Sequence, residues 1–268
     1  MTAKKIMIYM GSVRKKETLS FAQTFEARLR GRLEVDVEYV WLKDFNLQQC
    51  KGCFLCLSKG EELCSLKDDR DQLVQKLHEA DGVVFAAPNY TLHVPAMMKN
   101  FFDRLCYIYH RPRFFGKVST SLVTQGAYGG QYLLKYFEET AQLWGFTAVR
   151  GASVTTVNPR PPSEQQAIDQ AAARVAQRFA QALKRPTGRT PPLKWFAMFR
   201  FVRSMYRAVP DEKSRDYRYF RDNGWFEANY YYPVKLNVLH HALGKLIDVI
   251  AAKMARKRDR ALRAASKA

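Results

Sequence analysis

The first 184 residues alternate between short apolar segments and amphipathic segments, and this alternation restricts the fold more than any other feature. The apolar, β-prone segments predict strands at 5–10, 35–42, 82–87, 117–124 and 147–155. Segments with apolar residues at helical spacing predict helices at 19–30, 68–79, 95–107, 131–144 and 163–183. Because parallel strands need covering crossovers, we expect an α/β fold with three layers around a doubly wound, five-stranded parallel sheet.

Sheets of this kind bind ligands outside the carboxyl ends of their strands. That rule selects the loops at 11–20, 88–93 and 125–130. In the first loop Gly11 permits a tight turn, and the start of the following helix offers N–H groups that suit a phosphate. The loop has neither the G-x-G-x-x-G nor the Walker pattern, which argues against a dinucleotide or ATP there. Simple helix capping by the hydroxyl side chains is the alternative interpretation.

The last third of the chain differs in composition. Residues 185–268 hold 19 Lys/Arg and 7 Asp/Glu, whereas residues 1–184 hold 25 and 18. The Pro- and Gly-rich stretch 185–192 has the composition of a linker, and 193–232 contain thirteen aromatic residues. The sequence therefore predicts a first domain at 1–184 and a mostly helical, basic, aromatic-rich extension at 185–268.

Two segments of this extension, 193–207 and 239–254, have the pattern of basic amphipathic helices. Peripheral contact with a membrane is one use of such helices. We favour packing of these helices across the first domain or against a dimer partner, since apolar stripes at helical spacing are more often core. The expected packing stripe of the second segment is Leu243, Leu246, Ile247, Ile250 and Met254. Nucleic-acid binding is disfavoured, because the sequence carries no recognised module.

Three motifs in order, GSVRK, APNYTLHVPAMMKNFFDR and TQGAYGG, resemble the NADPH-dependent FMN reductase family and its iron–sulfur flavoprotein branch. The resemblance covers residues 1 to about 155 and implies a flavodoxin-like fold with bound FMN. It implies that the FMN phosphate is held by Ser12, Arg14, Lys15, Thr18 and Ser20. It also implies that the flavin ring is bordered by Pro88, Asn89, Tyr90, Thr91, Gln125, Gly126, Tyr128 and Gly129.

Four cysteines lie within fifteen residues, at Cys50, Cys53, Cys56 and Cys64. Their spacing matches the compact pattern that the iron–sulfur flavoprotein branch uses for a [4Fe–4S] cluster. Structural zinc is the competing metal, and reduced thiols beside a flavin are the metal-free alternative. Cys106, on an apolar helix face, is expected in the core.

The resemblance implies an oxidoreductase in which FMN takes a hydride from NAD(P)H and passes electrons to a quinone or another small acceptor. No catalytic side chain is assigned, because the protein would supply positioning and electrostatics. The alternative is an iron–sulfur flavoprotein that carries electrons between protein partners, with the tail as a membrane or protein docking element. Family resemblance also implies a homodimer or higher homo-oligomer. We expect a cytoplasmic protein, since no apolar run approaches the roughly 20 residues of a membrane span.

Overall fold

The chain is represented by a computed structural model that describes residues 3–157, 159–185, 188 and 190–266. It divides into two compact units. The first unit combines Met1–Cys53 with Ser65–Arg185, and the second combines Phe54–Cys64 with Pro186–Ala268. Among the described residues, none of the helices has both the length and the apolar character needed to cross a membrane.

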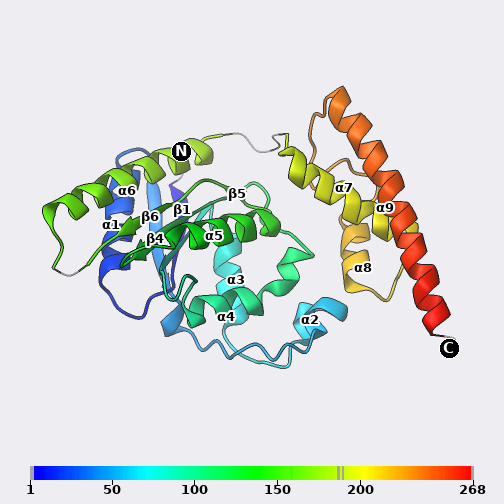
Figure 1. Cartoon of the computed structure of the whole chain (residues 1–268), viewed down its shortest axis with the longest axis horizontal. Coiled ribbons are helices and arrows are strands. Elements are labelled where there is room, and N and C mark those ends of the chain that lie inside the picture. The colour runs from blue at the N-terminus through cyan, green and yellow to red at the C-terminus, as the bar shows by residue number, and fades with distance from the viewer. Residues whose placement is uncertain (1–2, 158, 186–187, 189, 267–268) are drawn as a thin grey trace. The chain divides into compact units, whose positions relative to one another are not determined.

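The first unit is built on a parallel sheet in the strand order β2-β1-β3-β4-β5, with β6 also paired to β4 (Figure 1). The strands are β1 (Lys4–Met10), β2 (Val35–Trp41), β3 (Gly82–Pro88), β4 (Val118–Gln125), β5 (Thr147–Ala148) and β6 (Ala152–Thr155). The order reverses between β1 and β3, which places a crevice at the carboxyl ends of these strands. The predicted doubly wound α/β fold is confirmed.

The fifth predicted strand is wrong in one respect, since it is interrupted and forms β5 and β6. Ser119 of β4 pairs with Ala148, and Leu122 of β4 pairs with Ala152. An interval of three residues on β4 is therefore paired with an interval of four residues on the segment that forms β5 and β6. One extra residue of this kind is a β-bulge. Gly151 lies in the interruption, where an added Cβ would stand 2.1 Å from the carbonyl oxygen of Ser121. Only glycine fits that approach.

Helices cover both faces of the sheet. One face packs against α1 (Glu17–Arg30) and α6 (Pro162–Leu183), where Phe25 and Phe179 meet edge to face at 5.8 Å. The other face packs against α3 (Arg70–Glu79), α4 (Ala96–Arg104) and α5 (Gly130–Trp144). There Tyr9 of β1 stacks on Phe101 and its hydroxyl donates to the Leu73 carbonyl at 2.7 Å. Short helices occur at η1 (Leu42–Asp44) and η3 (Cys106–Tyr109).

The second unit consists of α7 (Leu193–Ala208), α8 (Arg215–Asp222) and α9 (Val238–Ala265), together with α2 (Leu55–Ser58) and η2 (Glu61–Leu63). Helices α8 and α9 begin at polar caps: Ser214 accepts from the Tyr217 N–H, and Asn237 accepts from the His240 N–H. An aromatic cluster holds the unit together. Phe199, Phe220, Trp225, Tyr230 and Tyr231 lie in mutual ring contact. The mostly helical, aromatic extension expected from the sequence is therefore present.

Helices α7 and α9 are joined by a charged network. Asp248 of α9 accepts hydrogen bonds from Arg200, Arg203 and Ser204 of α7. Both arginines are nearly buried, and the pKa of Asp248 is lowered, since these bonds outweigh the effect of burial, which acts to raise it. Basic residues on α7 therefore belong to the interior of this unit.

Helix α9 packs against α7 through its small residues. The residues of α9 that are buried are small: Gly244, Ala251 and Ala255. A Cβ on Gly244 would lie 3.0 Å from Arg200 Cζ and 3.1 Å from Phe196 Cζ, so α7 approaches closest where α9 has no side chain. Most of the stripe expected to pack, including Leu246 and Ile250, is exposed and lies outside this contact. Packing of that stripe across the first domain or against a dimer partner stays a prediction.

Candidate functional site

The loop after β1 leaves the start of α1 uncapped. Lys16 occupies the N-cap position and makes no side-chain capping bond. Ser12 is buried and donates to the Arg14 carbonyl at 3.1 Å, while Thr18 bonds the hydroxyl of Thr124 at 2.8 Å. The predicted hydroxyls therefore do not satisfy the helix start. The first N–H groups of a helix lack partners within it and attract an anion.

Basic side chains surround the start of α1, and one of them, Arg160, was not predicted from the sequence. Arg14 and Lys15 are exposed. Arg160, which follows β6, forms an ion pair with Glu17 in the first turn of α1 and donates to Ser20 Oγ at 3.4 Å. Burial acts to raise the pKa of Glu17, but bonds from Arg160 and Thr156 lower it below its usual value. Glu17 is thus an ionised acid whose charge Arg160 balances beside the predicted phosphate loop.

The loops after β3 and β4 are tied to each other through Asn89. Its main-chain N–H donates to the Thr124 carbonyl at 2.7 Å, and its side-chain amide donates to the Tyr128 carbonyl at 2.8 Å. Thr124 also holds Thr18, so one chain of hydrogen bonds links all three predicted loops. Asn89 Oδ1 is buried and has no hydrogen-bond partner. A buried carbonyl oxygen of this kind is a ready acceptor for a ligand N–H.

Residues 90–93 form a strained two-residue hairpin. Tyr90 and His93 exchange backbone hydrogen bonds of 2.9 and 3.0 Å. Between them Thr91 and Leu92 have φ angles of 50° and 63°. A turn with two positive φ angles favours Asn and Gly, and a β-branched residue is rare there. Strain of this kind concentrates at ligand sites and costs on the order of 1–3 kcal/mol per residue.

The glycine-rich loop after β4 is packed closely on one side and open on the other. Gly129 has a φ of 95°, and an added Cβ would lie 2.4 Å from Leu92 Cδ2. The side chain of Gln125 is used by the fold, because it accepts from the Gly130 N–H at 2.6 Å and donates to Thr155 at 3.2 Å. At Gly126 an added Cβ would meet nothing within 4 Å. Open space therefore begins beside Gly126.

Two aromatic rings stand at the same edge of the sheet. Tyr128 is 70% exposed and Tyr90 is 48% exposed, which is unusual for large apolar rings. Pro88, the last residue of β3, is half-buried and pairs with Thr124 in the sheet. The fold thus brings the predicted ring-binding residues of both loops to the carboxyl edge, next to the loop predicted to hold phosphate.

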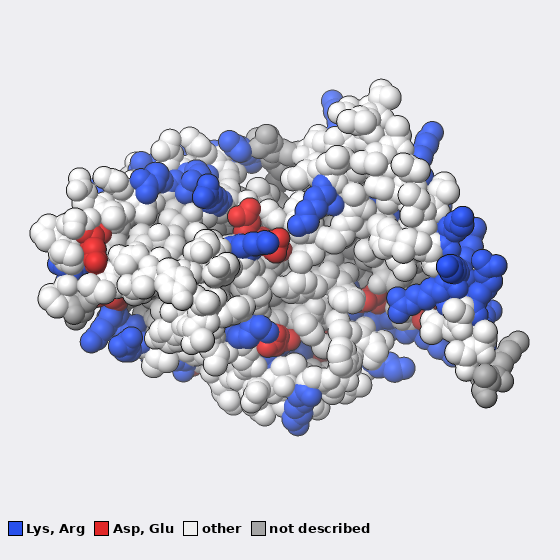
Figure 2. Space-filling view, viewed as in Figure 1, with Lys and Arg blue, Asp and Glu red and all other residues white. Residues whose placement is uncertain are grey.

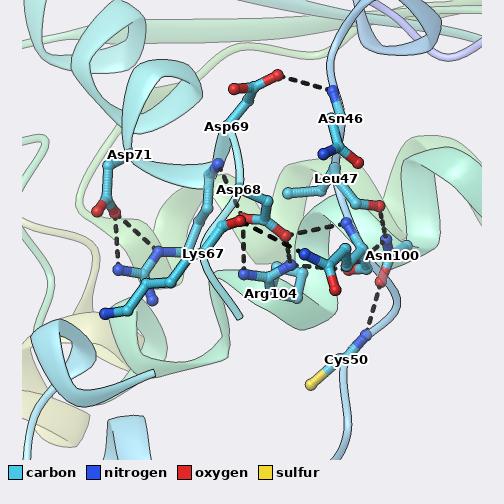
Figure 3. A network of polar contacts seen from close by, with 11 residues as sticks. Asn46, Leu47, Cys50, Lys67, Asp68, Asp69, Asp71, Asn100 and Arg104 are labelled. Carbon is cyan, nitrogen blue, oxygen red and sulfur yellow. Dashed lines mark hydrogen bonds and ion pairs between the residues drawn. The ribbon is translucent and has the colours of Figure 1, made fainter. Parts of the chain in front are cut away.

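The first part of the cysteine segment is held by α4 (Figure 3). Asn100 accepts from the Cys50 N–H at 3.1 Å and donates to the carbonyls of Leu47 and Gln48. Arg104 donates to the Gln48 carbonyl at 2.7 Å and forms a bidentate ion pair with Asp68. Arg104 and Asp68 are almost fully buried. The arginine bonds lower the pKa of Asp68 against the effect of burial, which acts to raise it.

The four clustered cysteines belong to different units. Cys50 and Cys53 are in the first unit, and Cys56 and Cys64 are in the second. Cys53 is exposed and the other three are partly buried. In the described part of the chain, no group of three or more His, Cys, Asp or Glu side chains is arranged to hold a metal ion. Cys106, expected in the core, is also only partly buried.

Comparison with known proteins identifies the family. The family model for NADPH-dependent FMN reductase matches residues 4–158. The chain belongs to this family. An iron-sulfur flavoprotein of Archaeoglobus fulgidus is 36% identical over 115 residues, which make up 42% of this chain and 51% of the relative. This FMN reductase family member thus spans about half the length of that relative.

Solved structures share the fold. The NAD(P)H:quinone oxidoreductase from Methanothermobacter marburgensis aligns with a TM-score of 0.53 and 17% identity, over 66% of this chain and 96% of its own. RosB, with the bound intermediate 8-demethyl-8-formylriboflavin-5'-phosphate, aligns with a TM-score of 0.54 and 13% identity, over 88% of this chain and 92% of its own. The RosB alignment includes more of this FMN reductase family member than the α/β unit alone.

Proposed function

We propose that this chain binds FMN at the carboxyl edge of the sheet and transfers electrons from NAD(P)H to a quinone or another small acceptor. The observation that carries the proposal is the hydrogen-bonded connection of three loops through Thr18, Thr124 and Asn89. Membership of the FMN reductase family supports the same assignment.

The residues present fit a phosphorylated flavin. An uncapped helix start with nearby Arg14 and Lys15 suits a phosphate dianion. The buried, unpartnered Asn89 Oδ1 suits a donor on a ring edge, and the space beside Gly126 suits a flat group. Tyr90 and Tyr128 offer exposed aromatic faces for it.

Each set of residues has a role in this proposal. The phosphate would be held by Ser12, Arg14, Lys15, Thr18 and Ser20. The ring would be bordered by Pro88, Asn89, Tyr90, Thr91, Gln125, Gly126, Tyr128 and Gly129. Since both ends of the Gln125 amide are engaged in the loop, its contribution would be to fix the loop rather than to contact the ring. Bound FMN would supply the redox chemistry, because it can take a hydride from NAD(P)H and pass the electrons on to the acceptor.

A [4Fe–4S] cluster at Cys50, Cys53, Cys56 and Cys64 is a second part of the proposal. The spacing of the cysteines supports it, as do the relatives named iron-sulfur flavoproteins. The described side chains do not gather into a metal-binding group, so no electron-transfer step is assigned to a cluster. With a cluster, the chain would serve as an electron carrier between proteins, and the basic second unit would be its docking element on a protein or membrane. We also propose a homodimer or higher homo-oligomer, as the family resemblance implies; light scattering of the purified protein tests it.

An absorption spectrum of anaerobically purified protein tests both parts, with iron and sulfide assayed on the same sample before NADPH or NADH is added. The reductase proposal expects a flavin spectrum that bleaches within seconds of nicotinamide addition. Flavin with stoichiometric iron and sulfide and slow bleaching would favour the electron carrier. Colourless protein that takes up no added FMN would reject both.

A further inference from the structure

The outer face of α9 is apolar although it is exposed. Leu239 and Val249 are each 67% exposed, and Leu246, Ile250 and Met254 are each about half exposed. At 100° per residue, Leu239, Leu246 and Val249 lie on the side of α9 opposite the buried Ala251 and Ala255. Ile250 and Met254 lie between these two sides of the helix. Since α7 contacts the small-residue face, the exposed surfaces of these large apolar side chains are not used in that contact.

The same helix is strongly basic toward its C-terminal end. Its exposed basic residues there are Lys253, Arg256, Lys257, Arg258, Arg260 and Arg263. Asp259 is the one acid between positions 249 and 265, and it pairs with Arg263 at 2.9 Å. Figure 2 shows this concentration of Lys and Arg near the C-terminal end of the chain. An apolar face that continues into a basic cluster matches an anionic, partly apolar surface.

We infer that the exposed face of α9 docks on the surface of an anionic lipid membrane, with the apolar residues at the headgroup boundary and the basic residues against acidic headgroups. The basic cluster opposes a second copy of the chain on this face, because two copies would bring like charges together. The face is aliphatic, so it offers no stacking surface to nucleic acid. A membrane satisfies both of its properties at once.

This inference specifies the docking role proposed for the second unit, but it needs no flavin. The test is co-sedimentation of the full chain with phosphatidylcholine vesicles, with and without 30% phosphatidylserine, at low and at physiological salt. We expect binding to the anionic vesicles only, weakened severalfold by salt, since each basic residue near the surface is worth about fivefold in affinity. Flavin content is measured on the same samples, so failure of the flavin site is detected separately.

Three variants separate the contribution of the apolar face to vesicle binding from that of the basic residues. Leu246→Glu with Ile250→Glu places charge on the apolar face and should reduce binding at least tenfold. Arg256→Gln, Lys257→Gln and Arg260→Gln together should reduce it about a hundredfold. Leu193→Glu with Gln181→Glu adds the same two charges at exposed positions outside α9 and should leave binding nearly unchanged. Circular dichroism checks that each variant keeps its helices.

Some results would overturn the inference. These are the absence of sedimentation with anionic vesicles at low salt, and binding that the Leu246→Glu, Ile250→Glu variant retains in full. A third result that would overturn the inference comes from light scattering. If the wild-type chain is an oligomer and this variant is a monomer, the face is an interface between copies.

Discussion

The side-chain amide of Asn89 donates to the main-chain carbonyl of Tyr128 at 2.8 Å, so the loop after β3 holds the loop after β4. The same side chain keeps its oxygen buried and unpartnered. We expect Asn89→Leu to weaken FMN binding at least tenfold, because it removes both the loop contact and an acceptor, each worth about 1 kcal/mol. Quenching of flavin fluorescence measures the affinity. The exposed Asn223, changed to Leu, is the control.

Two glycines of one loop make a matched pair. Gly129→Ala should lower the free energy of unfolding by about 2 kcal/mol or more, since its φ of 95° disfavours a side chain and Leu92 is in the way. Gly126→Ala should leave stability nearly unchanged but weaken FMN binding, if the open space receives the ring. Denaturant unfolding and flavin titration separate the two effects. Equal FMN affinity in wild type and Gly126→Ala would argue against a ring at this position.

Arg160 should matter for the phosphate more than for the flavin ring. Arg160→Ala leaves the ionised Glu17 unbalanced beside the phosphate loop, so FMN affinity should fall about tenfold or more, while riboflavin affinity stays nearly constant. Adding Glu17→Gln should restore much of the FMN affinity. A loss for FMN and riboflavin alike would instead mean that Arg160 only supports the fold.

Asn100 should control the reactivity of Cys50. Its side chain fixes the Cys50 N–H and two neighbouring carbonyls. Asn100→Ala frees this segment, and we expect severalfold faster alkylation of Cys50 by iodoacetamide, followed by peptide mass spectrometry. Lys99→Ala removes only a neighbouring exposed ion pair and is the control. An unchanged rate would show that the segment is held by other contacts.

Acid should loosen the second unit through Asp248. Its pKa in the folded chain lies below the usual 3.8, so the ionised form stabilises folding. This stabilisation is complete well above pH 4 and is lost as the pH falls through the lowered pKa. Asp248→Asn leaves two nearly buried arginines without a counter-ion, which should cost about 3 kcal/mol at neutral pH. In the variant, the stability lost between pH 6 and pH 3 should be smaller than in the wild type, as thermal unfolding would show.

Local sequence patterns were sufficient to predict the strands and helices of the α/β unit. Continuous apolar runs such as the one in β3 and the amphipathic period of α1 predict their elements directly. The Gly11 loop and the tyrosine loops could be placed at one edge because the carboxyl ends of parallel strands converge. The bulge at Gly151 could not be foreseen, since it depends on the approach of the Ser121 carbonyl from the neighbouring strand.

Residues that act across long sequence distances were missed. Arg160 pairs with Glu17 over 143 positions, and Asn100 reaches Cys50 over 50. Neither carries a motif, so only the folded arrangement reveals them. The face by which α9 contacts α7 was missed for a different reason. The apolar stripe of α9 resembles a packing face, but buried arginines on α7 select the small residues Gly244 and Ala251 as the contact.

The assignment of Phe54–Cys64 to the second unit changes how the chain can be divided. The polypeptide leaves the first unit after Cys53, returns at Ser65 and leaves again after Arg185. A protein shortened at residue 185 would therefore retain an eleven-residue loop stripped of the helices it groups with, and with it two of the four clustered cysteines. Ending the chain at the apparent linker therefore does not remove the whole second unit. Exchanging this unit between homologues requires that Phe54–Cys64 and Pro186–Ala268 be exchanged together.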